Sequence, residues 1–87
     1  MEAKKKILIC DDEEGIRESL RLILEDNYDL TMAKSGKECL EILSADNDHK
    51  VVLLDIKMPK QNGLEVMKEI KKNHPDIKVV IVTGYAS

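Results

Sequence analysis

Acidic and hydroxyl side chains directly follow three short apolar segments of this 87-residue sequence. They are Asp11 and Asp12 after residues 7–10, Asp55 after residues 51–54, and Thr83 after residues 79–82. If the three segments are parallel strands, their carboxyl ends meet at one edge of a sheet, which is where sites form in open α/β folds. With the first and third segments adjacent, three carboxylates would converge on one small patch.

Such a patch is unfavourable unless something offsets its charge. Two carboxylates about 5 Å apart repel by roughly 3 kcal/mol at an effective dielectric constant of 20. A buried acidic cluster therefore either raises a pKa or holds a cation. Oxygen ligands without neighbouring His or Cys favour Mg²⁺ or a similar hard ion, which keeps several waters and leaves room for a phosphoryl oxygen.

A structural explanation remains open for the first acidic pair. Asp11 and Asp12 precede a predicted helix, where the helix dipole stabilises negative charge by a few tenths to about 1 kcal/mol. Asp55 has no such explanation, because it follows a buried strand and caps no nearby helix. Asp55 is therefore the residue that most favours a functional site.

The elements that position these residues alternate between strand and helix. Apolar runs at residues 7–10, 51–54 and 79–82 are continuous, which is typical of strands buried on both faces of a parallel sheet. Residues 28–33 alternate more and suit a sheet edge. The sequence predicts one α/β domain in the order βαβαβαβ.

The three intervening segments have helical periodicity. The residues predicted to face the sheet are Ile16, Leu20, Ile23 and Leu24 in the first helix, Cys39, Leu40 and Leu43 in the second, and Leu64, Met67 and Ile70 in the third. Arg17 is placed on the water-facing side of the first helix. Ser35 and Glu38 have the spacing of a capping box. Asn62 can cap the third helix, which must end near Pro75.

Composition excludes several classes of protein. Lys plus Arg is 14 and Asp plus Glu is 17, a net charge of −3, and aromatic residues make up 2%, so a nucleic-acid binder is disfavoured. The longest apolar run has four residues, too short to span a membrane. Cys10 and Cys39 are predicted to be core residues of a reduced, cytoplasmic protein. His49 and His74 are isolated and are predicted to be surface histidines.

The combined pattern resembles the receiver domain of bacterial two-component response regulators. The residues that carry the resemblance are Asp11-Asp12, Asp55, Lys57-Met58-Pro59, Asn62-Gly63 and Thr83-Gly84. The resemblance covers the whole chain. It implies a flavodoxin-like parallel sheet with strand order 2-1-3-4, and a phospho-accepting signalling module in place of an enzyme.

The resemblance also implies a role for each site residue. Asp55 is the expected phosphoacceptor, and Thr83 is the expected switch hydroxyl that turns toward the phosphoryl group. Mg²⁺ is expected to be held by Asp12, Asp55 and the main-chain carbonyl of Lys57, with Asp11 acting through a water on the metal. A sensor histidine kinase is the expected phosphoryl donor.

The sequence departs from the family after the fourth strand. Family members continue through a fourth helix, a fifth strand with a phosphoryl-binding lysine, and a fifth helix, whereas this sequence ends at Ser87. No lysine of the chain can be assigned that role. The expectation is therefore a partial receiver domain over residues 1–87, either a fragment or a chain completed by another copy. The strand at residues 79–82 would form an unprotected edge and favour a homodimer or a higher oligomer.

Two other functions compete with the receiver. A nucleotide-binding enzyme needs glycines after the first strand, where this chain has Asp-Asp-Glu-Glu. A haloacid-dehalogenase-like phosphohydrolase needs aspartates two positions apart, but Asp11 and Asp12 are adjacent. The remaining alternative is a receiver fragment that keeps the metal patch but has no signalling output.

Overall fold

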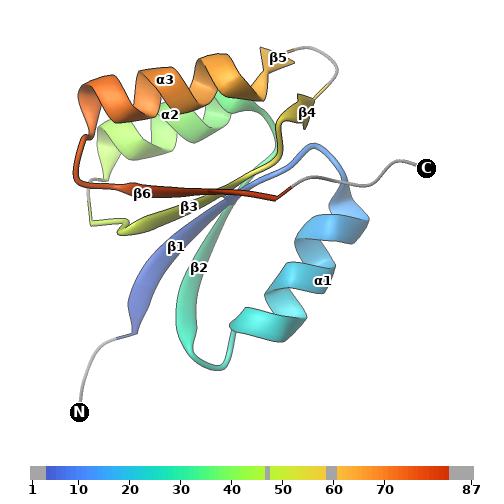
Figure 1. The fold of residues 1–87 in the computed structure, drawn as a ribbon. Coiled ribbons are helices and arrows are strands. Elements are labelled where there is room, and N and C mark those ends of the chain that lie inside the picture. Colours follow the sequence, from blue (N-terminus) through green and yellow to red (C-terminus); the bar gives the residue numbers. More distant parts are fainter. Residues whose placement is uncertain (1–3, 47, 59–60, 83–87) are drawn as a thin grey trace.

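Four strands form the central sheet: β1 (Lys5–Cys10), β2 (Tyr28–Ala33), β3 (Val51–Leu54) and β6 (Lys78–Ile81). All pairs are parallel, as the apolar runs predict, and the order is β2-β1-β3-β6, as the family resemblance implies (Figure 1). The structure is a computed structural model that describes residues 4–46, 48–58 and 61–82, with only the main chain described at residues 57, 58 and 61.

Three helices cover the two faces of this sheet. They are α1 (Glu14–Leu24), α2 (Gly36–Ala45) and α3 (Gly63–Asn73). Helices α2 and α3 lie side by side on one face, and α1 lies on the other (Figure 1). The architecture is the flavodoxin-like α/β fold that the sequence predicts.

The main core lies between the sheet and the α2–α3 layer. Leu8, Val52 and Leu54 from the strands are completely buried against Leu43 and Ile70 from the helices. Burying each of these side chains stabilises the fold by about 1.5–3 kcal/mol. Cys10 and Cys39 belong to the same core and are unpaired thiols, which confirms their predicted structural role.

The predicted caps of α2 and α3 are present. Ser35 Oγ accepts a hydrogen bond from Glu38 N at 3.1 Å, and Asn62 Oδ1 accepts one from Leu64 N at 2.9 Å. Helix α3 ends at Asn73, two residues before Pro75, because the residue before proline avoids the helical conformation. Both caps satisfy amide groups that the helix itself leaves unpaired.

The inward faces of α1 and α3 differ from the prediction at two positions. Ile23 is 70% exposed and Leu64 is 46% exposed, whereas Val66 is buried at 1%. Helix α3 begins at Gly63, and Val66, four residues before the buried Ile70, takes the inward position that Leu64 was predicted to have. Helix α1 has no fully buried residue in the structure, and Ile16, Leu20 and Leu24 are half-buried.

His49 is buried, so the prediction of a surface histidine is wrong there. The residue is 2% exposed, and its ring lies between Thr31 Oγ1 at 3.1 Å from Nε2 and the Asp46 carbonyl at 3.3 Å from Nδ1. These two partners satisfy both ring nitrogens, and their hydrogen bonds offset the desolvation cost of burying the polar ring. His74 is partly exposed, at the end of α3.

A short hairpin connects β3 to α3 and was not predicted. Strands β4 (Lys57–Met58) and β5 (Gln61–Asn62) pair in antiparallel fashion outside the main sheet. Each has only two residues, too few for a hydrophobic alternation to be visible in the sequence.

Strand β6 is the outer strand of the described sheet. It pairs with β3 on one side, and Val80 and Ile81 are 41% and 37% exposed. This agrees with the prediction of an interior-type sequence at a sheet edge. No helix among the described residues is long and apolar enough to cross a membrane.

Candidate metal centre

Asp11 and Asp55 are fixed by main-chain bonds at the ends of adjacent strands. Asp11 N donates to the Ala33 carbonyl at 3.1 Å, and Asp55 N donates to the Cys10 carbonyl at 3.0 Å. These bonds extend the parallel hydrogen-bond pattern one residue beyond β1 and β3. The two side chains therefore leave the sheet from backbone positions that the strand pairing sets.

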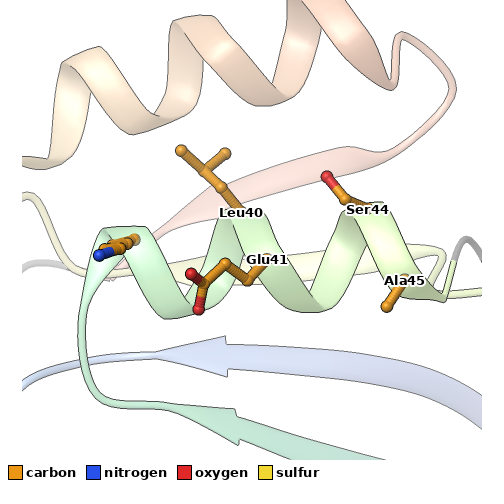
Figure 2. Close-up of a pocket in the computed structure, with 5 residues that line it drawn as sticks. Leu40, Glu41, Ser44 and Ala45 are labelled. Carbon is orange, nitrogen blue, oxygen red and sulfur yellow. The ribbon is translucent and has the colours of Figure 1, made fainter.

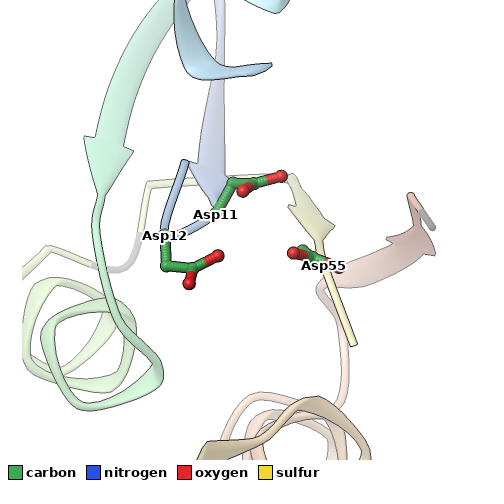
Figure 3. Close-up of side chains that lie close together, drawn as sticks. All are labelled: Asp11, Asp12 and Asp55. Carbon is green, nitrogen blue, oxygen red and sulfur yellow. The ribbon is translucent and has the colours of Figure 1, made fainter. Parts of the chain in front are cut away.

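The structure brings Asp11, Asp12 and Asp55 together. One carboxylate oxygen from each residue lies within 4.8 Å of the other two. Asp11 and Asp55 are 2% and 3% exposed, and Asp12 is exposed. Figure 3 shows the carboxylates of Asp12 and Asp55 facing each other between the two strand ends. Two buried acids and one exposed acid thus form a cluster of negative charge.

The turn between β1 and α1 is held by hydrogen bonds to Asp11. Glu13 N donates to Asp11 Oδ1 at 2.9 Å, and Arg17 Nη1 donates to the Asp11 carbonyl at 2.7 Å. Arg17 is half-buried, so its predicted place on the water-facing side of the helix is wrong. The available signal in the sequence was the position of Arg17, a cation six residues after Asp11. Helical periodicity alone places that cation in solvent.

Burial and like charges raise the pKa of Asp11 above its ordinary value. Desolvation is the main cause, and the negative charges of Asp55, Asp12 and Glu13 add to it. The hydrogen bond from the Glu13 amide acts in the opposite direction because it stabilises the ionised form. The ionised carboxylates of the cluster therefore repel one another, and a bound cation would offset this repulsion.

The donor set fits a hard divalent cation. All three side chains offer carboxylate oxygens, the ligands that Mg²⁺ prefers. Ligands on opposite sides of one Mg²⁺ are about 4.2 Å apart, since each metal–oxygen bond is about 2.1 Å. The observed spacing of up to 4.8 Å needs only a small closure, or a water in place of one direct ligand. The residues present are compatible with Mg²⁺.

Gly63 packs against the chain segment that carries Asp55. A Cβ atom on Gly63 would lie 2.3 Å from Ile56 Cα and 2.7 Å from the Asp55 carbonyl oxygen. Gly63 N also donates to the Ile56 carbonyl at 3.4 Å. Helix α3 can approach the metal centre this closely only because residue 63 has no side chain.

The structure describes only the main chain of one further predicted site residue and does not describe another. The main chain of Lys57 lies in β4, paired with Asn62, two residues after Asp55. Thr83 lies outside the described residues.

A separate groove runs along α2. It has a volume of about 690 Å³ and is lined by Lys37, Leu40, Glu41, Ser44 and Ala45 (Figure 2). None of the three aspartates contributes to it. Among the described residues, the acidic cluster is the group of three or more side chains whose spacing could hold a metal ion.

Comparison with known sequences identifies the family. Residues 7–87 match the family model described as the response regulator receiver domain. Response regulator RR06 of Streptococcus pneumoniae is 44% identical over 79 residues, which are 90% of this chain and 36% of that protein. Response regulator MprA of Mycolicibacterium vanbaalenii is 37% identical over 80 residues, 91% of this chain and 34% of that protein. The chain thus spans about a third of the length of these relatives.

Solved structures show the same fold. A CheY-like receiver domain protein from Methanospirillum hungatei superposes with a TM-score of 0.89 at 36% identity, covering 98% of this chain and 68% of that one. The response regulator TrrA of Thermotoga maritima, in complex with Mg²⁺ and BeF, gives a TM-score of 0.86 at 42% identity, with coverages of 94% and 71%. TrrA has also been solved in complex with the histidine kinase ThkA, with a TM-score of 0.85.

Proposed function

The chain belongs to the response regulator receiver family, and from that premise we propose that Asp55 accepts a phosphoryl group from a histidine kinase. The observation that carries this proposal is the convergence of Asp11, Asp12 and Asp55 within 4.8 Å at the ends of β1 and β3. In the transfer, the phosphorus–nitrogen bond of a kinase phosphohistidine breaks and a phosphorus–oxygen bond to Asp55 forms. The kinase imidazole leaves and takes up a proton.

The chain's own residues supply the nucleophile and its placement. The ionised carboxylate of Asp55 attacks, and the bond from Asp55 N to the Cys10 carbonyl fixes where the side chain starts. Asp12, Asp55 and the main-chain carbonyl of Lys57 would hold Mg²⁺, with Asp11 as the buried supporting carboxylate. When bound, Mg²⁺ offsets the negative charge of the carboxylates and of the transferring oxygens.

Two further roles belong to the same proposal. Thr83 is the hydroxyl that would turn toward the phosphoryl group. The domain acts as a cytoplasmic signalling module whose chemistry is confined to its own modification, without turnover of a separate substrate.

Replacement of Asp55 tests the assignment. With a small phosphodonor and Mg²⁺, we expect intact-mass spectrometry to show slow, substoichiometric addition of one phosphoryl group to the 87-residue chain. The reaction is expected to be slow because none of the lysines in these 87 residues matches the family's phosphoryl-binding lysine. Asp55→Asn should abolish the addition, since the amide is a poor nucleophile.

The control for this experiment is Asp76→Asn, which removes an exposed aspartate near the end of α3. It should leave the modification unchanged. Labelling that persists in Asp55→Asn would place the acceptor elsewhere, and the absence of any labelling under conditions that saturate Mg²⁺ would contradict the proposal. Rapid and complete labelling would show that this domain does not need the lysine for transfer.

The second candidate is a domain that associates with itself through β6, with no signalling output. The supporting observation is that Val80 and Ile81 are 41% and 37% exposed beside the outer edge of the described sheet. An edge strand offers unpaired main-chain groups to another chain, and burying an exposed valine or isoleucine adds up to about 1.5–3 kcal/mol.

We expect the 87-residue polypeptide to associate with increasing concentration, as measured by light scattering. Val80→Lys should reduce the association, because a lysine at a sheet edge disfavours strand addition. Leu64→Lys is the matched control, since Leu64 is 46% exposed and belongs to α3, not to the edge strand. A monomer at all concentrations, or equal effects of the two substitutions, would refute association through β6.

A further inference from the structure

Arg17 links α1 to the acidic cluster through the main chain. The hydrogen bond that the structure shows goes to the carbonyl of Asp11 and not to a carboxylate. Arg17 lies in the first turn of α1, and its Nη1 donates to the main-chain carbonyl of Asp11 at 2.7 Å. A hydrogen bond from a guanidinium is stronger than one between neutral groups, and partial burial protects it from competing water.

The bond acts on the peptide group that joins the first two acids. The Asp11 carbonyl belongs to the peptide between Asp11 and Asp12, so holding its oxygen fixes the direction in which the chain enters Asp12. Two other bonds already hold Asp11 itself, from its amide to Ala33 and from Glu13 N to its side chain. Arg17 provides the contact that reaches the Asp12 side of the turn.

The other arginine of α1 is held differently. Arg21 pairs with Glu18 of the same helix at 2.9 Å and with Glu25, the C-cap residue of α1, at 2.8 Å, and both acids are exposed. Such surface pairs contribute little to stability and touch no part of the acidic cluster. Arg17 and Arg21 therefore have the same charge and the same helix but different partners.

We propose that Arg17 is a positioning residue for the metal centre, holding the Asp11–Asp12 peptide so that Asp12 is presented to the cation. This rests on the proposed function, because it concerns the same Mg²⁺ site. Residues that orient metal ligands in this way typically change metal affinity 10- to 100-fold when they are replaced.

The two possible effects of Arg17 on Mg²⁺ have opposite signs. If Arg17 acted only through its charge, it would repel the cation, and removing it would tighten Mg²⁺ binding. If it acts by holding the turn, removing it frees Asp12 and weakens binding. The direction of the change therefore separates positioning from simple electrostatics.

The experiment is a titration of Mg²⁺ followed by amide NMR shifts in the wild type and three variants. Arg17→Met keeps the aliphatic stem and good helix propensity but removes the donors and the charge. We expect its affinity for Mg²⁺ to fall about ten-fold or more. Arg17→Lys keeps one donor and the charge and should recover part of the loss. Arg21→Met, which removes the same charge elsewhere on α1, should leave the affinity within about two-fold.

Each outcome decides the matter. Equal or tighter binding by Arg17→Met, with the wild type binding, would overturn the positioning role and leave the proposed function intact. A wild type that does not bind Mg²⁺ would refute the metal centre and with it this inference. If Arg17→Met does not fold, Arg17→Gln takes its place in the series, and wild-type or tighter Mg²⁺ binding by that variant would overturn the proposal.

Discussion

Gly63→Ala is expected to destabilise the protein by about 3 kcal/mol or more, because the added methyl group has no space. Its Cβ would lie 2.3 Å from Ile56 Cα and 2.7 Å from the Asp55 carbonyl oxygen. Both of these are main-chain atoms, so the clash cannot be relieved by a change of rotamer. Either α3 or the segment carrying Asp55 must move. Chemical denaturation followed by circular dichroism measures the loss.

The matched control is Gly15→Ala. Nothing lies within 4 Å of a Cβ built at Gly15, which is exposed near the start of α1. Alanine is favoured over glycine in a helix, so this variant should be more stable than the wild type by up to about 1 kcal/mol. If Gly63→Ala were as stable as the wild type, α3 would not be constrained by the segment after β3. In folded Gly63→Ala protein, Mg²⁺ affinity should fall as well, since Asp55 lies in the displaced segment.

The sheet could be predicted from sequence because its signal is local and repeated. Residues 7–10, 51–54 and 79–82 are continuous apolar runs, and the helical segments between them predict parallel pairing. The order β2-β1-β3-β6 was implied only by the family resemblance. The convergence of Asp11 with Asp55 was predictable once the first and third strands were taken as neighbours. Both acids follow strands directly, and adjacent parallel strands end at the same edge.

Contacts that depend on how far a side chain reaches were not predictable. Periodicity placed Arg17 in solvent, but its long side chain folds back to the Asp11 carbonyl at 2.7 Å. Isolation in the sequence made His49 look like a surface residue, yet Thr31, 18 positions earlier, completes its hydrogen bonding. The space requirement at Gly63 is likewise a matter of tertiary packing, since the sequence suggested only turn geometry there.

Asp11→Asn is expected to make the metal-free protein more stable and its Mg²⁺ site weaker. Asp11 is 2% exposed, and burial together with neighbouring acids raises its pKa, so its ionised form opposes folding. Asparagine keeps an oxygen that can accept the Glu13 amide bond but carries no charge. We expect a gain of about 1–2 kcal/mol at neutral pH, less than the roughly 3 kcal/mol between two unscreened carboxylates, because Asp12 of the cluster is exposed to water. Urea denaturation with a chelator present measures it.

The same variant should lose that advantage when the pH falls or Mg²⁺ is added. A carboxyl whose pKa is raised in the folded state binds its proton more tightly there, so the wild type gains stability as the pH drops through that pKa. The difference between Asp11→Asn and the wild type should therefore be full at neutral pH and vanish below the pKa of an unfolded aspartate. Saturating Mg²⁺ at about 100 times its Kd would stabilise the wild type by about 2.7 kcal/mol, and the variant by less.

Asp12→Asn is the control for this effect of burial. Asp12 belongs to the same cluster but is exposed, so its replacement should weaken Mg²⁺ binding with a much smaller gain in metal-free stability. Equal gains from the two substitutions would mean that mutual repulsion, and not the burial of Asp11, dominates the cost of the cluster. A loss of stability in metal-free Asp11→Asn would mean that the folded protein stabilises the ionised carboxylate of Asp11. That result would contradict the electrostatic repulsion that makes this site suited to a cation.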